Sequence, residues 1–341
     1  MKTIGIAGGG KMGASIFNML CKYNHFSLIW YVRSNSEKAQ NLHSRKLKRQ
    51  LKNGLLSLKE FESCSLKQVI TPNIEDLKDC DFIIETISED KNQKNQLIQN
   101  LLSLTRSSCI IASNTSSINI NLLANQQNLQ RMAGLHFFYP AEMKNIVELI
   151  SSDYTSDHTI NQIKSFLKSI ERNYLHQTTP DAFLLNRIML KIQLGYFKLS
   201  RSQGYTFKQI DSIVNEYMFS PGVFETMDTI GIDLIYKSAR NYIGMDENDE
   251  DYQPLMTYLE ECISDNRLGV KTGIGFINYN TDVPNVKITG IEKQHLLNSL
   301  ITCWNNALLW AKNNSNFSSD ELEFALNEYL STDIKNWNIL I

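Results

Sequence analysis

The chain has 341 residues, 42% of them hydrophobic, and its formal net charge is -2 at pH 7. This length is enough for two domains with a sizeable core, and the near-neutral charge gives no basic field of the kind that nucleic-acid binding requires. Because no apolar run reaches the roughly 18 residues of a membrane span and glycines interrupt the first apolar segment at once, we expect no membrane association and no ordinary signal peptide.

The first predicted element is a strand followed by a turn and a helix. Residues 2–7 are a short apolar strand, residues 8–13 have the pattern G-x-G-x-x-G, and residues 14–20 continue at helical spacing. The first glycine allows a tight turn, the second lets the backbone approach a pyrophosphate, and the third permits close packing of a helix whose free N–H groups favour phosphate. This context favours a dinucleotide site over a plain structural turn. The expected contacts are Gly8, Gly10, Lys11, Met12 and Gly13.

Apolar segments alternate with helical stretches up to about residue 178. A second strand is expected at residues 27–32, and a long polar helix follows from about Ser36. Residues 81–86 and 109–113 are short continuous apolar runs, which are typical of buried parallel strands. Beyond Thr178 the pattern is helical only. We therefore predict an α/β N-terminal domain with a Rossmann-type doubly wound sheet, residues 1–178, followed by an all-α C-terminal domain.

Polar residues follow the strand predicted at residues 109–113. Loops at the carboxyl ends of such strands face the cofactor crevice, so Asn114 is a candidate cofactor contact and the Ser116 hydroxyl has a route to the substrate. Asn186, at the start of the helical part, is a polar residue among apolar neighbours, and a buried amide needs a partner. The alternatives are that the loop only caps the next helix and that Asn186 satisfies a backbone group.

A histidine and a carboxylate are placed as a pair by two apolar segments, residues 133–138 and 146–150. Pro140 and its polar neighbours indicate a turn, and an antiparallel pairing centred near Glu142 sets His136 opposite Glu148. A carboxylate against an imidazole fixes its tautomer and raises its basicity, which suits removal of a proton from a substrate hydroxyl. The alternative is a core histidine beside a solvated glutamate.

The helical part contains an internal repeat. Residues 184–186, Leu-Leu-Asn, recur at 296–298, and residues 215–217, Asn-Glu-Tyr, recur at 327–329, both at an offset of 112 residues without a gap. This pattern predicts a duplicated helical unit, against the alternative of two unrelated amphipathic helix pairs. We divide the helical part into a first copy, residues 179–281, and a truncated second copy, residues 282–341.

The six cysteines show no C-x-x-C spacing. We interpret them as reduced and mostly packed thiols of a cytoplasmic protein, and we expect no metal site.

Several motifs together resemble those of one known family, the L-3-hydroxyacyl-CoA dehydrogenases, over about residues 1–280. The resemblance implies NAD-linked interconversion of an L-3-hydroxyacyl thioester and its 3-ketoacyl thioester, as in fatty acid metabolism. It implies that His136 is the base, that Glu148 is its partner, that Ser116 and Asn186 hold the reacting oxygen and the substrate, and that Glu89 lies near the nicotinamide. The motifs that carry it are residues 8–13, 81–85 with 89–90, 113–117, 134–138, 147–148, 186–187, 221–222 with 224–225, 231–233, and 271–273 with 275–276.

Some positions depart from the family pattern. Tyr139, which we place at the substrate, replaces an asparagine, and residues 180–183 carry one residue more than the family's Pro-Gly-Phe, which leaves the acyl group and its carrier open. Tyr31 stands where the family has an acid for the adenosine ribose, with Arg33 and Ser34 just beyond. A missing carboxylate removes repulsion toward a 2′-phosphate, and a nearby arginine attracts it. The resemblance implies NAD, whereas these residues favour NADP.

A basic helical stretch lies in the region that the resemblance assigns to the CoA phosphates, with Lys48 and Lys52 as substrate contacts; a solvated helix face is the alternative. We expect a small-molecule acyl thioester as substrate, and a homodimer, or a monomer if the second helical copy replaces the partner. A dehydrogenase of a free 3-hydroxy acid or of a carrier-bound acyl group, and a nucleotide-binding scaffold without catalysis, stay open. The basic residues are Arg45, Lys46, Lys48, Arg49 and Lys52.

Overall fold

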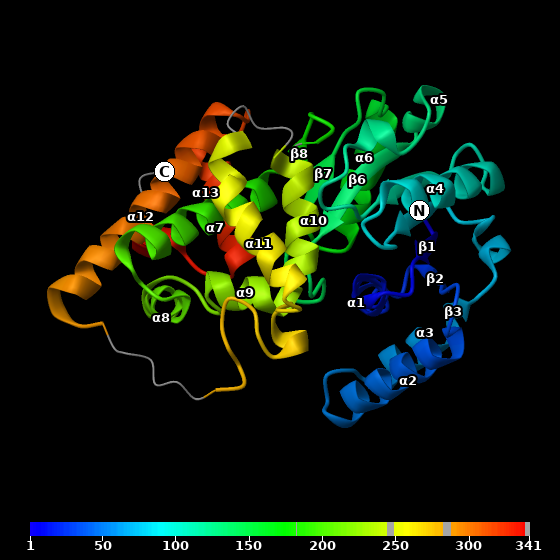
Figure 1. The fold of residues 1–341 in the computed structure, drawn as a ribbon. Helices are drawn as coiled ribbons and strands as arrows, with labels where there is room; N and C mark the ends of the chain where they lie inside the picture. The colour runs from blue at the N-terminus through cyan, green and yellow to red at the C-terminus, as the bar shows by residue number, and fades with distance from the viewer. Residues whose placement is uncertain (182, 244–248, 282–287, 338–341) are drawn as a thin grey trace. The chain divides into compact units, whose positions relative to one another are not determined.

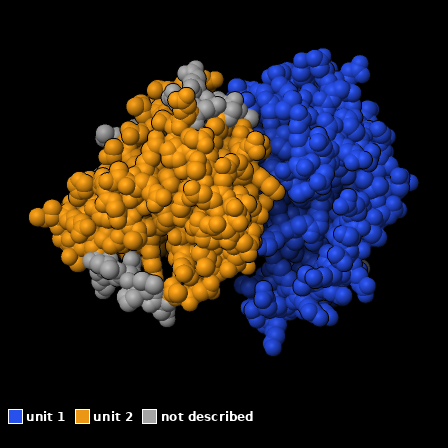
Figure 2. Space-filling model, viewed as in Figure 1, with its two compact units in different colours: residues 1–183 blue, residues 184–341 orange. Residues whose placement is uncertain are grey.

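The computed structural model describes residues 1–181, 183–243, 249–281 and 288–337. It divides the chain into two compact units, residues 1–183 and residues 184–341, drawn blue and orange in Figure 2. The segment 180–183, which is one residue longer than the family's Pro-Gly-Phe, contains Ala182, and this residue lies outside the described residues. The same holds for parts of the predicted second helical copy, residues 282–287 and 338–341.

Unit 1 is built on one eight-stranded sheet with the strand order β3-β2-β1-β4-β5-β6-β7-β8 (Figure 1). The six strands from β3 to β6 run parallel, whereas β7 is antiparallel to β6 and β8 is parallel to β7. The predicted Rossmann-type sheet is therefore confirmed. The strands are β1 (Thr3–Ala7), β2 (Ser27–Tyr31), β3 (Gln68–Thr71), β4 (Phe82–Glu85), β5 (Ile110–Ser113), β6 (Met132–Phe137), β7 (Ile146–Ile150) and β8 (Asn173–Gln177).

The central strands are buried on both faces, which explains their continuous apolar sequences. Helix α1 packs Ile16, Phe17 and Leu20 into the core next to β1 and β2. The polar strands β3 and β8 have no counterpart among the predicted elements. The helices of this unit are α1 (Lys11–Leu20), α2 (Ser36–Lys52), α3 (Leu58–Leu66), α4 (Lys91–Leu104), α5 (Gln126–Leu129) and α6 (Asp157–Ser169).

Unit 2 is helical over its described residues, as predicted for the C-terminal part. Two isolated bridges at Gly269, Ile274 and Asn278 close a short loop after α11. The helices are α7 (Leu184–Gln203), α8 (Phe207–Tyr217), α9 (Val223–Ile230), α10 (Ile232–Ile243), α11 (Gln253–Ser264), α12 (Gly290–Asn313) and α13 (Ser319–Leu330).

Two helix pairs of unit 2, α7 with α8 and α12 with α13, show the same sequence offset of 112 residues. A capping box of Thr206 and Gln209 begins α8, and a capping box of Ser318 and Glu321 begins α13, 112 residues later in each case. The first helices of the two pairs, α7 and α12, pack along one another (Figure 1). Helix α12 also packs against α8, and α13 against α7, so the first helix of each pair contacts the second helix of the other.

Candidate active site

The histidine and the carboxylate predicted to pair do so. In the antiparallel register of β6 and β7, His136 lies opposite Glu148, and Nδ1 of His136 is 2.8 Å from Oε2 of Glu148. The side chain of Glu148 is fully buried, and that of His136 is 8% exposed. With Nδ1–H directed at the carboxylate, the lone pair of the neutral imidazole lies on Nε2, the atom at which a proton could be accepted.

A third side chain extends this pair across the next strand. Gln177, at the end of β8, donates from Nε2 to Oε1 of Glu148 over 3.0 Å and is itself buried. The ring of Phe138 meets the imidazole edge to face, with centroids 4.4 Å apart. Gln177 was not predicted from the sequence, because its strand is polar and gives no apolar signal.

The predicted loop after β5 is organised around Glu89. The Oε1 atom of Glu89 accepts from the Ser116 hydroxyl over 3.1 Å and from the Ser116 backbone N–H over 2.8 Å, as well as from both neighbours, Thr115 and Ser117. Burial raises the pKa of Glu89, but the charge of Lys94 and the hydroxyl and N–H donors outweigh it and hold the pKa below its usual value. The structure thus brings together Glu89 and Ser116, two residues that the sequence assigned to different roles.

A buried ion pair between Lys94 and Glu85 lies next to Glu89 and this loop. Lys94 of α4 is 1% exposed and donates to both oxygens of Glu85, over 2.9 and 3.1 Å, while its Nζ lies 3.5 Å from Glu89. The Ser113 hydroxyl donates to Glu85 as well, over 2.5 Å. Sequence reasoning missed Lys94. The available signal was Glu85, a carboxylate at the end of an otherwise apolar strand, which must find a cationic or hydrogen-bonding partner when it is buried.

Asn114 connects the loop to the histidine strand. Its Oδ1 accepts from the backbone N–H of Phe137, the residue after His136, over 2.9 Å. Asn114, which was predicted to contact the cofactor, thus links the loop after β5 to β6 by a hydrogen bond.

Of the three glycines of the G-x-G-x-x-G pattern, one has room for a side chain. A Cβ at Gly8, whose φ is +146°, would lie 2.5 Å from Thr86 Oγ1, and a Cβ at Gly13 would lie 2.2 Å from the Gly8 carbonyl oxygen. At Gly10 a Cβ would meet nothing within 4 Å. Helix α1 begins at Lys11, next to the half-buried Met12, and Gly10 provides no side-chain cap. Space beside Gly10 and a helix start without a side-chain cap are the features that a pyrophosphate site requires.

The segment between β2 and α2 holds the residues predicted to select the cofactor. Tyr31 is the last residue of β2, and Arg33 and Ser34 are exposed. Asn35 follows in the left-handed region with φ of 61°, and its side chain does not cap α2. A guanidinium, a hydroxyl and an uncapped helix start thus lie within a few residues of one another.

The basic stretch falls on α2. Lys48 and Lys52 are exposed, whereas Lys46 pairs with Glu142, with Nζ 2.5 Å from Oε1. The Ser15 hydroxyl also donates to Glu142. Tyr139, in the turn between β6 and β7, is 58% exposed.

Asn186 lies in unit 2, in the first turn of α7. Its Nδ2 donates to the hydroxyl of Tyr242 on α10 over 3.1 Å. Hydrogen bonds therefore join His136, Glu148 and Gln177 in one group and Ser116 and Glu89 in another. Asn186 has its hydrogen bond to Tyr242 within unit 2.

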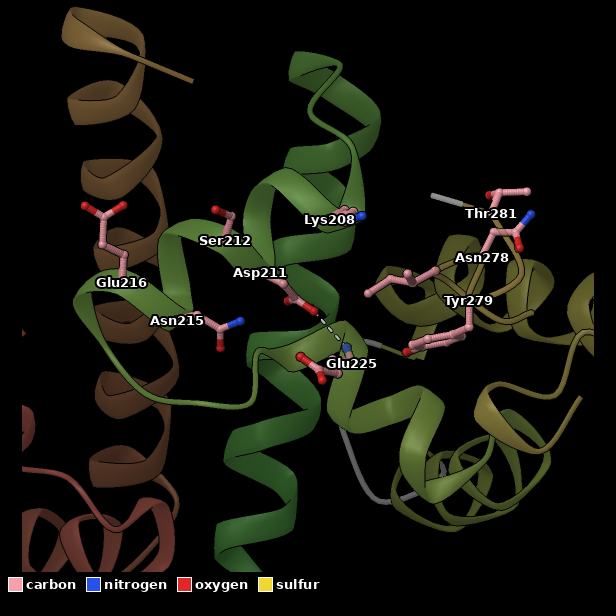
Figure 3. A pocket seen from close by; sticks show the side chains of 10 residues that line it. Lys208, Asp211, Ser212, Asn215, Glu216, Glu225, Asn278, Tyr279 and Thr281 are labelled. Atoms are coloured by element: carbon pink, nitrogen blue, oxygen red, sulfur yellow. Dashed lines mark hydrogen bonds between the residues drawn. The ribbon is translucent and has the colours of Figure 1, made fainter. Parts of the chain in front are cut away.

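A pocket of about 640 Å³ in unit 2 contains none of the predicted site residues (Figure 3). Its buried Asp211 accepts from the backbone N–H groups of Phe224 and Glu225 at the start of α9, over 3.1 and 2.7 Å. Burial raises the pKa of Asp211 to about 7 despite these donors. Over the described residues, no helix is long and apolar enough to cross a membrane, and no group of three or more His, Cys, Asp or Glu side chains is arranged to hold a metal ion.

Two family models match most of the chain. One, described as the NAD binding domain of 3-hydroxyacyl-CoA dehydrogenase, matches residues 3–178, and the other, described as the C-terminal domain of 3-hydroxyacyl-CoA dehydrogenase, matches residues 183–279. The mitochondrial hydroxyacyl-coenzyme A dehydrogenase of Homo sapiens is 28% identical over 288 residues, which cover 82% of this chain and 91% of that protein. The alpha subunit of the fatty acid oxidation complex of Pseudomonas putida is 29% identical over 208 residues, 61% of this chain and 29% of that longer protein.

Solved structures agree. The (S)-3-hydroxybutyryl-CoA dehydrogenase of Ralstonia eutropha superposes with a TM-score of 0.73 at 26% identity, covering 82% of this chain and 100% of that one. The 3-hydroxybutyryl-CoA dehydrogenase of Escherichia coli gives a TM-score of 0.74 at 24% identity, covering 85% of this chain and 62% of that longer one, and shows the same fold.

Proposed function

The chain belongs to the 3-hydroxyacyl-CoA dehydrogenase family, and we propose that it interconverts an L-3-hydroxyacyl thioester of CoA and its 3-ketoacyl thioester with His136 as general base. The observation that carries the proposal is the buried contact of 2.8 Å between His136 and Glu148. It is the arrangement that a dehydrogenase of a CH–OH group needs in order to move the hydroxyl proton.

In the oxidation, the O–H bond at C3 of the substrate breaks and its proton passes to Nε2 of His136, while the C3–H bond breaks and a carbonyl forms. The nicotinamide cofactor, when bound, supplies the acceptor for the hydride that leaves C3. The imidazolium that results is stabilised by Glu148, whose carboxylate is already desolvated and needs no reorganisation. In the reduction, the same imidazolium returns the proton to the carbonyl oxygen.

Ser116 contributes to this chemistry through its oxygen. Its hydroxyl donates to Glu89 over 3.1 Å, which orients the side chain, and the family resemblance assigns the Ser116 oxygen to the reacting oxygen of the substrate. We assign Asn186 to holding the substrate on the basis of the family resemblance. Lys48 and Lys52 of α2 are proposed for the CoA phosphates, which is supported by their exposure and by the absence of an ion pair for either among the described residues.

The glycine motif fits a dinucleotide. Its open side at Gly10 and crowded sides at Gly8 and Gly13 are the conditions for a pyrophosphate close to the backbone at the start of α1. The family model supports NAD. We propose in addition that NADP is accepted, because Arg33, Ser34 and the uncapped start of α2 offer donors to a 2′-phosphate.

The second helix pair is proposed to take the place of a subunit partner, so that the chain acts as a monomer. This proposal is supported by the shared register of α8 and α13 and by the packing of α7 along α12. The family models end at residue 279, before α12 begins. We also propose a cytoplasmic location, because the structure contains all six cysteines as free thiols.

One assay separates these proposals from the alternatives. Acetoacetyl-CoA is supplied with NADH or with NADPH, and oxidation of the reduced cofactor is followed by absorbance. Turnover with the CoA thioester supports the proposed function. Turnover only with free acetoacetate or with a carrier-bound acetoacetyl group moves the substrate to one of the alternatives, and no turnover with tight cofactor binding indicates a scaffold.

A further inference from the structure

Three buried polar side chains form one row across the sheet. His136 of β6, Glu148 of β7 and Gln177 of β8 come from neighbouring strands in the order β6-β7-β8. Residues 136 and 148 are opposite one another, and residue 177 lies two positions beyond Leu175, the residue opposite 148. Because side chains two residues apart point to the same face of a strand, all three lie on one face.

The hydrogen-bond direction at Gln177 follows from chemistry. A carboxylate only accepts, so the amide nitrogen must face it, and the contact of 3.0 Å between Nε2 of Gln177 and Oε1 of Glu148 is a donated hydrogen bond. Gln177 and His136 thus hold the two oxygens of Glu148 from opposite sides, over 3.0 and 2.8 Å. The plane of the carboxylate is fixed between them.

We infer that Gln177 is a positioning residue for the proposed reaction: it orients the Glu148 carboxylate toward His136 and does so without adding charge. A neutral donor suits this place. A cation at position 177 would satisfy the same oxygen but would cancel part of the negative charge that stabilises the imidazolium. An apolar side chain would leave the charge intact but would let the carboxylate turn away from Nδ1 of His136.

The ionisable groups next to Gln177 include two on its own face, Glu148 from β7 and, beyond it, His136 from β6. His176, the preceding residue of β8, points to the opposite face, where its Nε2 contacts the Ser151 hydroxyl over 3.0 Å. Burial lowers the pKa of His176, and the charge of Lys164 of α6 lowers it further. His176 therefore offers a control on the same strand that does not touch Glu148.

The test uses three variants of the full chain: Gln177→Leu removes the donor at similar volume, Gln177→Glu keeps the shape but replaces the donor by an acceptor, and His176→Leu is the control. Reduction of acetoacetyl-CoA is measured with the nicotinamide cofactor that gives turnover. We expect kcat of Gln177→Leu to fall about tenfold, because the loss of this charge-assisted hydrogen bond weakens the stabilisation of the imidazolium in the transition state. The KM values for cofactor and thioester, and the kcat of His176→Leu, should stay within about twofold of wild type.

The isosteric variant gives a readout that a merely structural role would not move. A carboxyl at position 177 donates only when it is protonated, so the kcat of Gln177→Glu relative to wild type should recover as the pH falls from about 8 to about 6, whereas that of Gln177→Leu should not. If Gln177→Leu does not fold, the pH-dependent recovery of Gln177→Glu alone decides. An equal loss in all three variants, or no recovery, overturns the inference.

The inference rests on the proposed function, and His136→Gln separates the two. If His136→Gln abolishes turnover while both Gln177 variants turn over at the wild-type rate, the positioning role fails and the proposed base stands. If His136→Gln turns over normally, the proposed mechanism itself is wrong.

Discussion

Replacement of His136 by glutamine is the sharpest test of the proposed base. Glutamine has no proton-accepting nitrogen, but its amide N–H is able to replace Nδ1–H as a donor to the buried Glu148, which now receives that contact over 2.8 Å. The fold should therefore survive, whereas His136→Ala would remove a partner from a fully buried carboxylate and destabilise unit 1. Loss of one positioned base lowers rates by about a hundredfold to ten-thousandfold, or roughly 3 to 5 kcal/mol in the activation free energy.

The assay compares kcat and cofactor affinity in the same preparation. The glycine motif and the segment after β2 are untouched by the substitution, so we expect binding of the reduced cofactor, followed by its fluorescence, to match wild type while turnover falls by the stated amount. Glu148→Gln should act through the same imidazole, lowering kcat and altering the pH–rate profile, because the imidazolium loses its counter-charge. Turnover of His136→Gln within a factor of a few of wild type would remove His136 from the mechanism, as would cofactor affinity that falls in parallel with the rate.

Three further predictions concern other parts of the chain. Arg33→Ala should weaken binding of NADPH far more than that of NADH, since only the former carries the 2′-phosphate; equal weakening, or a wild-type protein that plainly prefers NADH, would contradict NADP recognition. Cutting the chain after Asn280 should expose the face of α7 that α12 covers and cause dimerisation, aggregation or loss of stability. A product that is soluble, equally stable and in the same oligomeric state by light scattering would make the second copy an independent appendage. The pKa of Asp211 is about 7 in the fold and about 3.9 when unfolded, so the native state binds this proton more tightly and the free energy of unfolding should fall as pH rises between these values. Asp211→Asn should make the free energy of urea unfolding less dependent on pH over this range. An unchanged pH dependence would refute the raised pKa of Asp211.

The parts of the site that the sequence predicted are those fixed by local pattern. Strands β4 and β5 were visible because strands buried on both faces are continuously apolar. The pairing of His136 with Glu148 was predictable because a short turn fixes the register of two adjacent strands, and a shift by one residue would turn every side chain to the other face. The functional assignment of Asn186 came from family resemblance, and its hydrogen bond to Tyr242 of α10 could not be read from any local pattern.

The parts that were missed are held by partners distant in sequence. Lys94 stands in a polar helical stretch and has the pattern of a solvated position, yet it is buried against Glu85 and close to Glu89. Gln177 belongs to a strand whose half-polar sequence resembles a loop, and that strand forms only because β7 offers it a free edge. In both cases a buried carboxylate creates the demand for a donor. The sequence reveals such a demand when an acid interrupts an apolar strand, as Glu85 and Glu148 do, but the donor is chosen by the packing of the strands and helices around it, and so it is known only once the topology is known.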